Sequence, residues 1–223
     1  MNDKPTRKAT LPVVPSRSEF LRRCKEYRDR EARDPMYVVA TKLLHMSWGK
    51  PQDMADGLGV LLLTWNNAFY RYAPPDFDRL AQCVAENLPA IEGFKARDIT
   101  SFSAADERGV RDLFERMLDA LQAGGRKTPV GTAKGLHLLS PGFFPIWDAY
   151  IAPAYQCRYD RDPAGAYLKF CATTSDMARA MAAYPRLDGR TLVKLIDEYN
   201  YVVFTLPHLK QRQPIKRSAR GGS

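Results

Sequence analysis

Apolar residues recur at three- and four-residue steps through most of this chain, which is the spacing of one face of an α-helix. The clearest case is residues 51–72, where large apolar side chains keep this spacing until Pro74-Pro75 interrupts it. No stretch shows the convincing alternation of apolar and polar residues that marks a half-buried strand. The pattern predicts a largely buried helix over residues 51–72. Its large apolar residues are Leu58, Leu61, Leu62, Trp65, Phe69 and Tyr72.

Start and stop signals divide the rest of the chain into further helices. Ser103 is expected to be the N-cap of one helix, and Asp162-Pro163 to begin another that runs to about Tyr184. Gly124-Gly125 ends the helix that follows Ser103, and Thr191 begins the last one. Further helices are expected over residues 17–33, 36–48 and 77–91. The sequence therefore predicts an all-α, compact bundle of about nine or ten helices, without an internal repeat.

The composition is that of a basic globular protein. The 223 residues are 45% apolar and include 34 Lys and Arg against 25 Asp and Glu, a net charge of +9. No apolar run approaches the ~20 residues that cross a bilayer, and the N-terminus lacks the apolar core of a signal peptide. We therefore expect a cytoplasmic monomer with no membrane partner. The surplus of positive charge favours nucleic acid as the partner.

Polar, basic ends frame one globular domain. Residues 1–15 are expected to be a flexible basic leader, residues 16–211 the helical domain, and residues 212–223 a flexible basic tail. The four cysteines and three histidines are scattered without a C-x-x-C pair, which argues against zinc and iron–sulfur sites. The cysteines are expected to be buried reduced thiols. We expect no metal and no cofactor.

A basic turn lies in the segment GGRKTPVGTAKGLHLL, residues 124–139. Pro129-Val130-Gly131 is predicted to form a tight turn, and a new helix is predicted to begin at Thr132. Backbone N–H groups at such a helix start suit a phosphate. Arg126 and Lys127 stand before this turn and Lys134 after it, so the segment indicates a contact with a nucleic-acid backbone.

A single carboxylate, Asp148, follows directly after the bulky run Phe143-Phe144-Pro145-Ile146-Trp147. One interpretation is a helix N-cap, because a side-chain oxygen there accepts hydrogen bonds from the first free N–H groups of the next helix. The other is a carboxylate that works in a pocket with aromatic walls. The two are compatible, since one side chain can do both.

The order of these motifs resembles the helix-hairpin-helix DNA glycosylases. In that family a Gly-hydrophobic-Gly hairpin, a helix, an apolar stretch and an Asp follow one another. Here Pro129-Val130-Gly131 stands at the hairpin, with Pro129 replacing the first glycine, and Phe144 to Asp148 stand at the apolar-Pro-Val-Asp motif. The resemblance implies two helical lobes around a DNA-facing cleft and assigns Asp148 as the catalytic residue. Lys134 is the nearest match to the lysine that attacks the sugar in bifunctional members, with phosphate contact as the alternative.

The resemblance also implies residues that bind DNA and hold the extruded base. Asn66 and Asn67 match the polar pair that fills the gap left by that base, with hydrogen bonding at the edge of the core as the alternative. Trp65, Trp147 and Tyr150 are candidate walls of the base pocket, although each can equally be a core residue. The residues expected to contact DNA are Arg126, Lys127, Val130, Gly131, Thr132, Asn66 and Asn67.

The implied activity is cleavage of the N-glycosidic bond of a modified or damaged base in double-stranded DNA. The similarity is to the 8-oxoguanine branch, and also to bacterial phage-defence glycosylases that remove glucosylated hydroxymethylcytosine. A rival interpretation is a non-catalytic helix-hairpin-helix protein that only holds DNA phosphates, for which Asp148 need only be a cap. A third is a helical RNA-binding or toxin protein.

Overall fold

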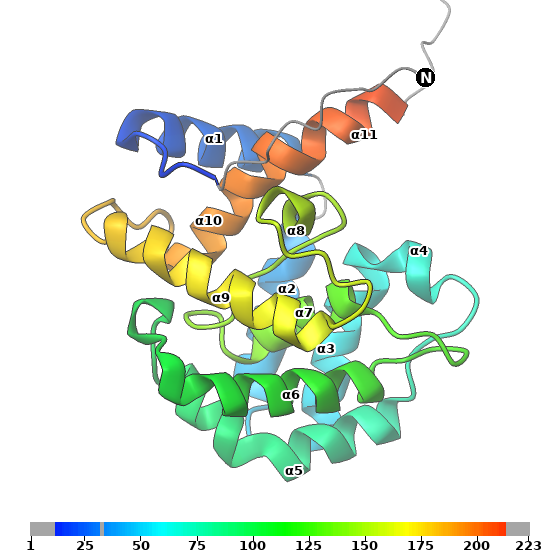
Figure 1. Cartoon of the computed structure of the whole chain (residues 1–223). Coiled ribbons are helices and arrows are strands. Elements are labelled where there is room, and N and C mark those ends of the chain that lie inside the picture. The colour runs from blue at the N-terminus through cyan, green and yellow to red at the C-terminus, as the bar shows by residue number, and fades with distance from the viewer. Residues whose placement is uncertain (1–11, 32–33, 213–223) are drawn as a thin grey trace, which may run out of the picture.

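A computed structural model of the chain describes residues 12–31 and 34–212 (Figure 1). Within these residues every regular element is a helix, and a single bridge between Ala123 and Arg126 is the only pairing of extended backbone. This confirms the all-α prediction. Most of the predicted leader and tail, residues 1–11 and 213–223, lies outside the described residues. None of the described helices combines the length and apolar character needed to cross a bilayer.

The helices agree in number with the prediction of about ten, although two of them, α4 and α8, are single turns. The α-helices are α1 (Arg17–Arg30), α2 (Asp34–Met46), α3 (Pro51–Trp65), α4 (Asn67–Tyr70), α5 (Phe77–Lys95), α6 (Glu107–Ala120), α7 (Pro129–Leu139), α8 (Ile151–Ala154), α9 (Pro163–Ala180), α10 (Leu192–Asn200) and α11 (Leu206–Arg212). Short 3₁₀ turns, η1 (Ile99–Ser101) and η2 (Ala104–Asp106), precede α6, and a π-helical segment, η3 (Tyr201–Thr205), joins α10 to α11.

The helix starts that the sequence marks are capped as predicted. Ser103 and Asp106 form reciprocal hydrogen bonds before α6. The Asp162 carboxylate accepts from the Gly165 N–H at 2.8 Å, with Pro163 in the first helical position. The Thr191 hydroxyl accepts from the backbone N–H of Lys194 at 3.2 Å. Each bond satisfies an N–H group that has no partner within its own helix.

The helix predicted over residues 51–72 is interrupted. It ends at Trp65, and Asn66 leaves the helical conformation with φ −124° and ψ 28° before the short helix α4 begins. The physical reason is tertiary, because the Asn66 side-chain amide donates to the Thr128 hydroxyl at 2.9 Å. The spacing of the apolar residues continues across the break, so it gives no sign of this hydrogen bond.

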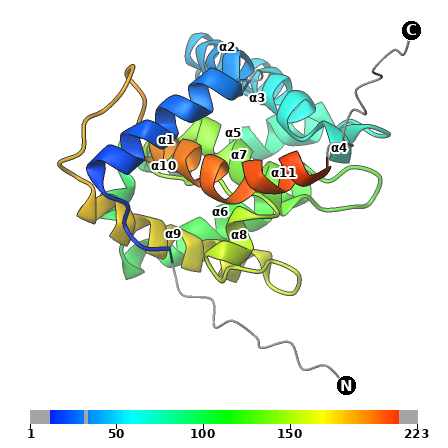
Figure 2. The same ribbon diagram turned by 90° about the horizontal axis from the view of Figure 1, so that it is seen from above.

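The helices form two groups that share one hydrophobic core. In the first, α3 packs on α2 and α5, and α6 packs on α5 and α7. In the second, the rod formed by α10, η3 and α11 packs beside α1 and meets α8 and α9. Figure 2 shows α1 and this rod lying side by side across the other helices. The core runs through both groups, and the four cysteines are buried in it with free thiols, as predicted.

A buried histidine links helices α2 and α7 to the segment after α7. The His137 ring is 0% exposed, and its Nδ1 donates to the carbonyl oxygen of Phe144 at 2.8 Å. This fixes the tautomer, so Nε2 accepts from the Tyr37 hydroxyl at 3.0 Å. Burial lowers the pKa of His137 to about 3, with the Lys194 ammonium adding to the effect.

Because His137 is buried, we expect the free energy of unfolding to fall in mild acid. Above pH 6.5, the ordinary pKa of histidine, the ring is neutral in both the folded and the unfolded chain. As the pH falls from 6.5 toward 3, only the unfolded chain binds the proton, so the free energy of unfolding falls by about 1.4 kcal/mol per pH unit. Urea unfolding at pH 7.5 and pH 5.5 measures this difference, which His137→Gln should reduce by about 1.4 kcal/mol.

The matched control is His45→Gln, because His45 is exposed on α2. It should keep the full difference between the two pH values. If His137→Gln keeps it as well, the buried ring is not the source of the acid sensitivity.

Candidate active site

A pocket of about 490 Å³ takes its walls from both groups of helices. The first group contributes residues 65–69 at the junction of α3 and α4, and residues 127–134 around the start of α7. The second contributes residues of α1, of the segment 146–151 and of the rod from α10 to α11. This volume lies in the range of ~300–1,000 Å³ that small-molecule sites occupy. The pocket thus gathers segments that lie far apart in the sequence.

Asp148 lines this pocket and is also a helix cap. Its Oδ1 accepts from the backbone N–H groups of Tyr150 and Ile151, each at 2.8 Å, where α8 begins. Its Oδ2 accepts from the hydroxyl of Thr205 at 2.6 Å. Three hydrogen bonds fix the carboxylate at the pocket wall, so both interpretations of Asp148 hold geometrically: it caps a helix and it faces the cavity.

The π-helical segment η3 supplies two further pocket residues, Tyr201 and Thr205. Thr205 contacts Asp148 as above, and the Tyr201 ring meets Tyr27 edge-on with centroids 5.4 Å apart. A π-turn within a longer helix is rare and frequently lies at a functional site. Here it lies where the rod passes Asp148.

Lys134 lines the pocket from α7 and is 8% exposed. Its Nζ donates to the carbonyl oxygen of Trp65 at 2.7 Å. Trp65 is the last residue of α3, so the ammonium binds a carbonyl at the C-terminus of that helix, where a positive charge is favourable. Lys134 therefore joins α7 to the α3–α4 junction inside the pocket. With this bond and 8% exposure, the Lys134 ammonium faces the pocket interior and not the outer surface of the protein.

The predicted phosphate-binding turn at Pro129-Val130-Gly131 is wrong. These residues form the first turn of α7, and the turn lies earlier, at Gly124 and Gly125, which have φ 55° and 73°. Pro129 has no N–H, and the N–H of Gly131 donates to the Thr128 hydroxyl at 3.0 Å. The helix start therefore offers a phosphate little beyond the N–H of Val130.

Gly131 and Thr132 are both buried, so their predicted contact with DNA is wrong as well. The Thr132 hydroxyl donates to the carbonyl oxygen of Thr128 at 3.0 Å. A Cβ on Gly131 would lie 2.8 Å from Cγ2 of Thr128 and 3.1 Å from Nδ2 of Asn66. Close packing of the α3–α4 junction explains this glycine, whereas a bound phosphate is not needed to explain it.

The predicted polar and basic residues gather at the pocket rim. Asn66, Asn67, Lys127 and Val130 line the pocket, and Asn67 and Lys127 are exposed. Lys127 pairs with Asp119 at 2.6 Å, an exposed ion pair of small energetic value. Arg126 is exposed beside the rim, where its guanidinium lies 5.2 Å from the centroid of the Phe69 ring.

Two of the three predicted aromatic walls line the pocket. Trp65 stacks on Tyr37 with centroids 5.8 Å apart, and Tyr150 stacks on His208 at 4.6 Å with ring planes 8° apart. The third, Trp147, is 0% exposed, and its Nε1 donates to the carbonyl oxygen of Pro129 at 3.0 Å. Its assignment to the pocket is wrong, because the Trp147 ring packs into the core.

Asp197, on α10, is a pocket residue that the sequence analysis missed. Burial raises its pKa, and the Lys194 ammonium opposes this effect. Every residue of α10 is buried, including Lys194, Asp197 and Glu198. Charged residues opposite an apolar helix face usually meet solvent, so the pattern gave no signal that these charges are inside.

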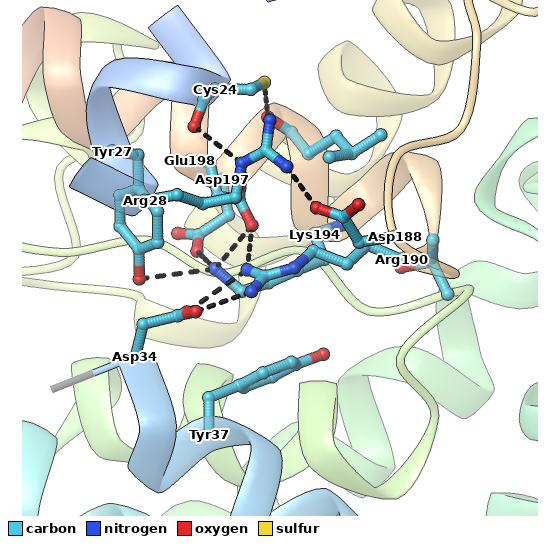
Figure 3. A network of polar contacts seen from close by, with 12 residues as sticks. Cys24, Tyr27, Arg28, Asp34, Tyr37, Asp188, Arg190, Lys194, Asp197 and Glu198 are labelled. Atoms are coloured by element: carbon cyan, nitrogen blue, oxygen red, sulfur yellow. Dashed lines mark hydrogen bonds and ion pairs between the residues drawn. The ribbon is translucent and has the colours of Figure 1, made fainter.

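The charges of α10 belong to a buried ion network, shown in Figure 3. Lys194 Nζ lies 3.0 Å from Asp197 Oδ2 and 3.5 Å from Glu198 Oε1. Arg190 pairs with Glu198 and, through both terminal nitrogens, with the carboxylate of Asp34 at 2.5 and 3.1 Å. Removal of one partner from such a network leaves a buried charge without compensation, which strongly destabilises the fold.

The pocket therefore brings together most of the site residues that the sequence predicts. Those that line it are Trp65, Asn66, Asn67, Lys127, Val130, Lys134, Asp148 and Tyr150. Neither protein-family models, curated proteins nor solved structures give a match to this chain.

Proposed function

We propose that this protein is a DNA glycosylase, which takes a modified base out of duplex DNA and cleaves its N-glycosidic bond to leave an abasic site. The observation that carries the proposal is the meeting of Asp148, Lys134 and Trp65 in one pocket, on three segments of the chain. The resemblance names these residues for catalysis and base binding from short motifs alone. The proposed chemistry also requires that these residues share one pocket, a condition that is independent of the motifs.

Asp148 suits the central step of this reaction. When the bond between C1′ and the base breaks, the base leaves with the bonding electrons and positive charge develops on the sugar. A carboxylate held in place by three hydrogen bonds stabilises that charge without first having to reorient. Water then adds to C1′ and passes a proton to the carboxylate. That proton goes on to neutralise the departed base anion, which completes the hydrolysis and restores the ionised Asp148.

The pocket suits an extruded base as well. A base within the duplex cannot be reached, so it must leave the stack. Trp65 and Tyr150 contribute aromatic surface to the pocket, and aromatic surface holds planar bases well. The exposed Arg126 and Lys127 beside the opening, with the net charge of +9, favour the approach of a polyanion.

For the substrate, we propose a modified base in a bacterial defence setting, with glucosylated hydroxymethylcytosine as the first candidate. The resemblance to phage-defence glycosylases supports this choice. The direct experiment is a panel of duplexes with damaged or modified bases, followed by detection of abasic sites.

The second candidate function is a non-catalytic DNA-binding protein. The hydrogen bonds of Asp148 to the N–H groups of Tyr150 and Ile151 favour it, because they account for the carboxylate as a cap alone. The two functions differ in whether the negative charge of Asp148 is needed.

Asp148→Asn is expected to abolish excision and to leave the fold intact. The amide oxygen can still accept both N–H bonds, and the Thr205 hydroxyl can turn to accept from the new amide N–H. The free energy of unfolding should therefore change by less than ~1 kcal/mol. Loss of the charge should slow excision by about a hundredfold or more. The rate on a substrate from the panel and the melting temperature test both parts.

The matched control is Asp162→Asn. Asp162 caps α9 through the Gly165 N–H, as Asp148 caps α8, but it does not line the pocket. It should excise at the wild-type rate. Excision by Asp148→Asn at that rate would refute the catalytic role and favour the DNA-binding alternative.

For Lys134 we expect a positioning role and no covalent chemistry, because its ammonium donates to the Trp65 carbonyl. Borohydride should then trap no protein–DNA adduct while abasic sites accumulate. Lys134→Ala should lower both stability and excision, whereas Lys127→Ala at the rim should leave stability unchanged. If borohydride does trap an adduct, and Lys134→Ala abolishes it while Lys127→Ala does not, Lys134 is instead the nucleophile of a bifunctional enzyme.

Binding to duplex DNA should weaken as salt rises, since neutralised phosphates release counterions. Arg126→Ala should weaken binding and reduce the slope of log affinity against log salt by about one, if the rim contacts the backbone. Arg108→Ala is the control. Arg108 is exposed near the start of α6, whereas Arg126 follows the end of that helix. Equal slopes for the two variants would place the DNA elsewhere on the protein.

A further inference from the structure

Asp197 brings a second carboxylate to the pocket. It is 5% exposed and lines the pocket from α10. Lys194 Nζ donates to its Oδ2 at 3.0 Å, and among the described residues it has no other hydrogen bond. Its Oδ1 is therefore available to a molecule in the pocket.

The ion network does not use up the acceptors of Asp197. Three carboxylates, those of Asp34, Asp197 and Glu198, share the two cations Arg190 and Lys194. Arg190 is engaged by Asp34 and Glu198, which leaves Asp197 with Lys194 alone. Of these five residues, Asp197 is the one that lines the pocket. The network thus holds one carboxylate in place at the cavity wall.

An aromatic surface lies close to this carboxylate. Lys194 Nζ is 3.0 Å from Asp197 Oδ2 and 5.4 Å from the centroid of the Trp65 ring, so the acid and the indole border the same ammonium. Trp65 also lines the pocket. Trp65 and Asp197 therefore line the same part of the pocket.

We propose that Asp197 recognises an exocyclic amino group of the extruded base, so that the substrates are amino-bearing bases and not their carbonyl counterparts. This inference rests on the proposed glycosylase function. With Lys194 donating to Oδ2, the carboxylate offers Oδ1 as an acceptor for one N–H donor, such as N4 of a cytosine or N6 of an adenine. A carbonyl at the same ring position would set two acceptors against each other and leave both without a donor.

Matched pairs of substrates test this selectivity. Glucosylated hydroxymethylcytosine and glucosylated hydroxymethyluracil differ in the amino or carbonyl group at ring position 4, and adenine and hypoxanthine differ likewise at position 6. In each pair that the enzyme processes, we expect the wild type to excise the amino-bearing base at least about a hundredfold faster. Excision of the carbonyl member at an equal or higher rate would overturn the proposal.

Asp197→Asn tests the residue itself. Its amide presents an N–H group that can pair with a carbonyl, so the preference within a pair should fall by at least about tenfold. Asp162→Asn is the control, because Asp162 does not line the pocket and its substitution should leave the ratio within a pair at the wild-type value. The melting temperature and binding to an abasic duplex show whether Asp197→Asn is folded.

The outcomes separate this inference from the proposed function. An unchanged ratio in a folded Asp197→Asn protein would remove Asp197 from base recognition while the glycosylase proposal stands. If Asp197→Asn does not fold, the ratio measured on the wild type decides. If no duplex of the panel yields abasic sites, the glycosylase function fails, and the inference fails with it.

Discussion

The structure depends on the burial of one ammonium group, that of Lys194. It is 0% exposed, it pairs with Asp197 and Glu198, and it lies over the rings of Tyr27, Tyr37 and Trp65 at 4.4 to 5.4 Å. A charge taken out of water must be matched nearby, or the fold loses several kcal/mol. This ammonium therefore ties α10 to α1, α2 and α3, and fixes the side of the pocket that holds Asp197.

Other parts of the pocket wall depend on helix ends. Trp65 ends α3, and its carbonyl receives the Lys134 ammonium; Asp148 caps α8 and receives the Thr205 hydroxyl. Free backbone groups at a helix end need partners, and here the partners are the side chains with the chemistry of the proposed reaction. The same hydrogen bonds thus stabilise the helix ends and orient the pocket.

The proposed reaction gives these two carboxylates different roles. Asp148 would stabilise the developing charge on the sugar, and Asp197 would accept a hydrogen bond from the edge of the base. Two carboxylates in one pocket can serve different purposes because their surroundings differ: Asp148 accepts from two N–H groups and a hydroxyl, while Asp197 accepts from a buried ammonium. If both proposals hold, substitution of Asp148 and of Asp197 should alter catalysis and selectivity separately.

Most of the helices, the caps at Ser103, Asp162 and Thr191, and the hydrogen bonds of Asp148 to the next N–H groups could be predicted from the sequence, because each depends on residues within a few positions of one another. The break at Asn66, the burial of Gly131, Thr132 and Trp147, and the place of Asp197 could not be predicted in this way. Those outcomes depend on partners far along the chain, such as Thr128 for Asn66. Periodicity shows which face of a helix is apolar, but it does not show whether the other face meets water. In α10 the polar face also packs against protein, because every residue of this helix is buried.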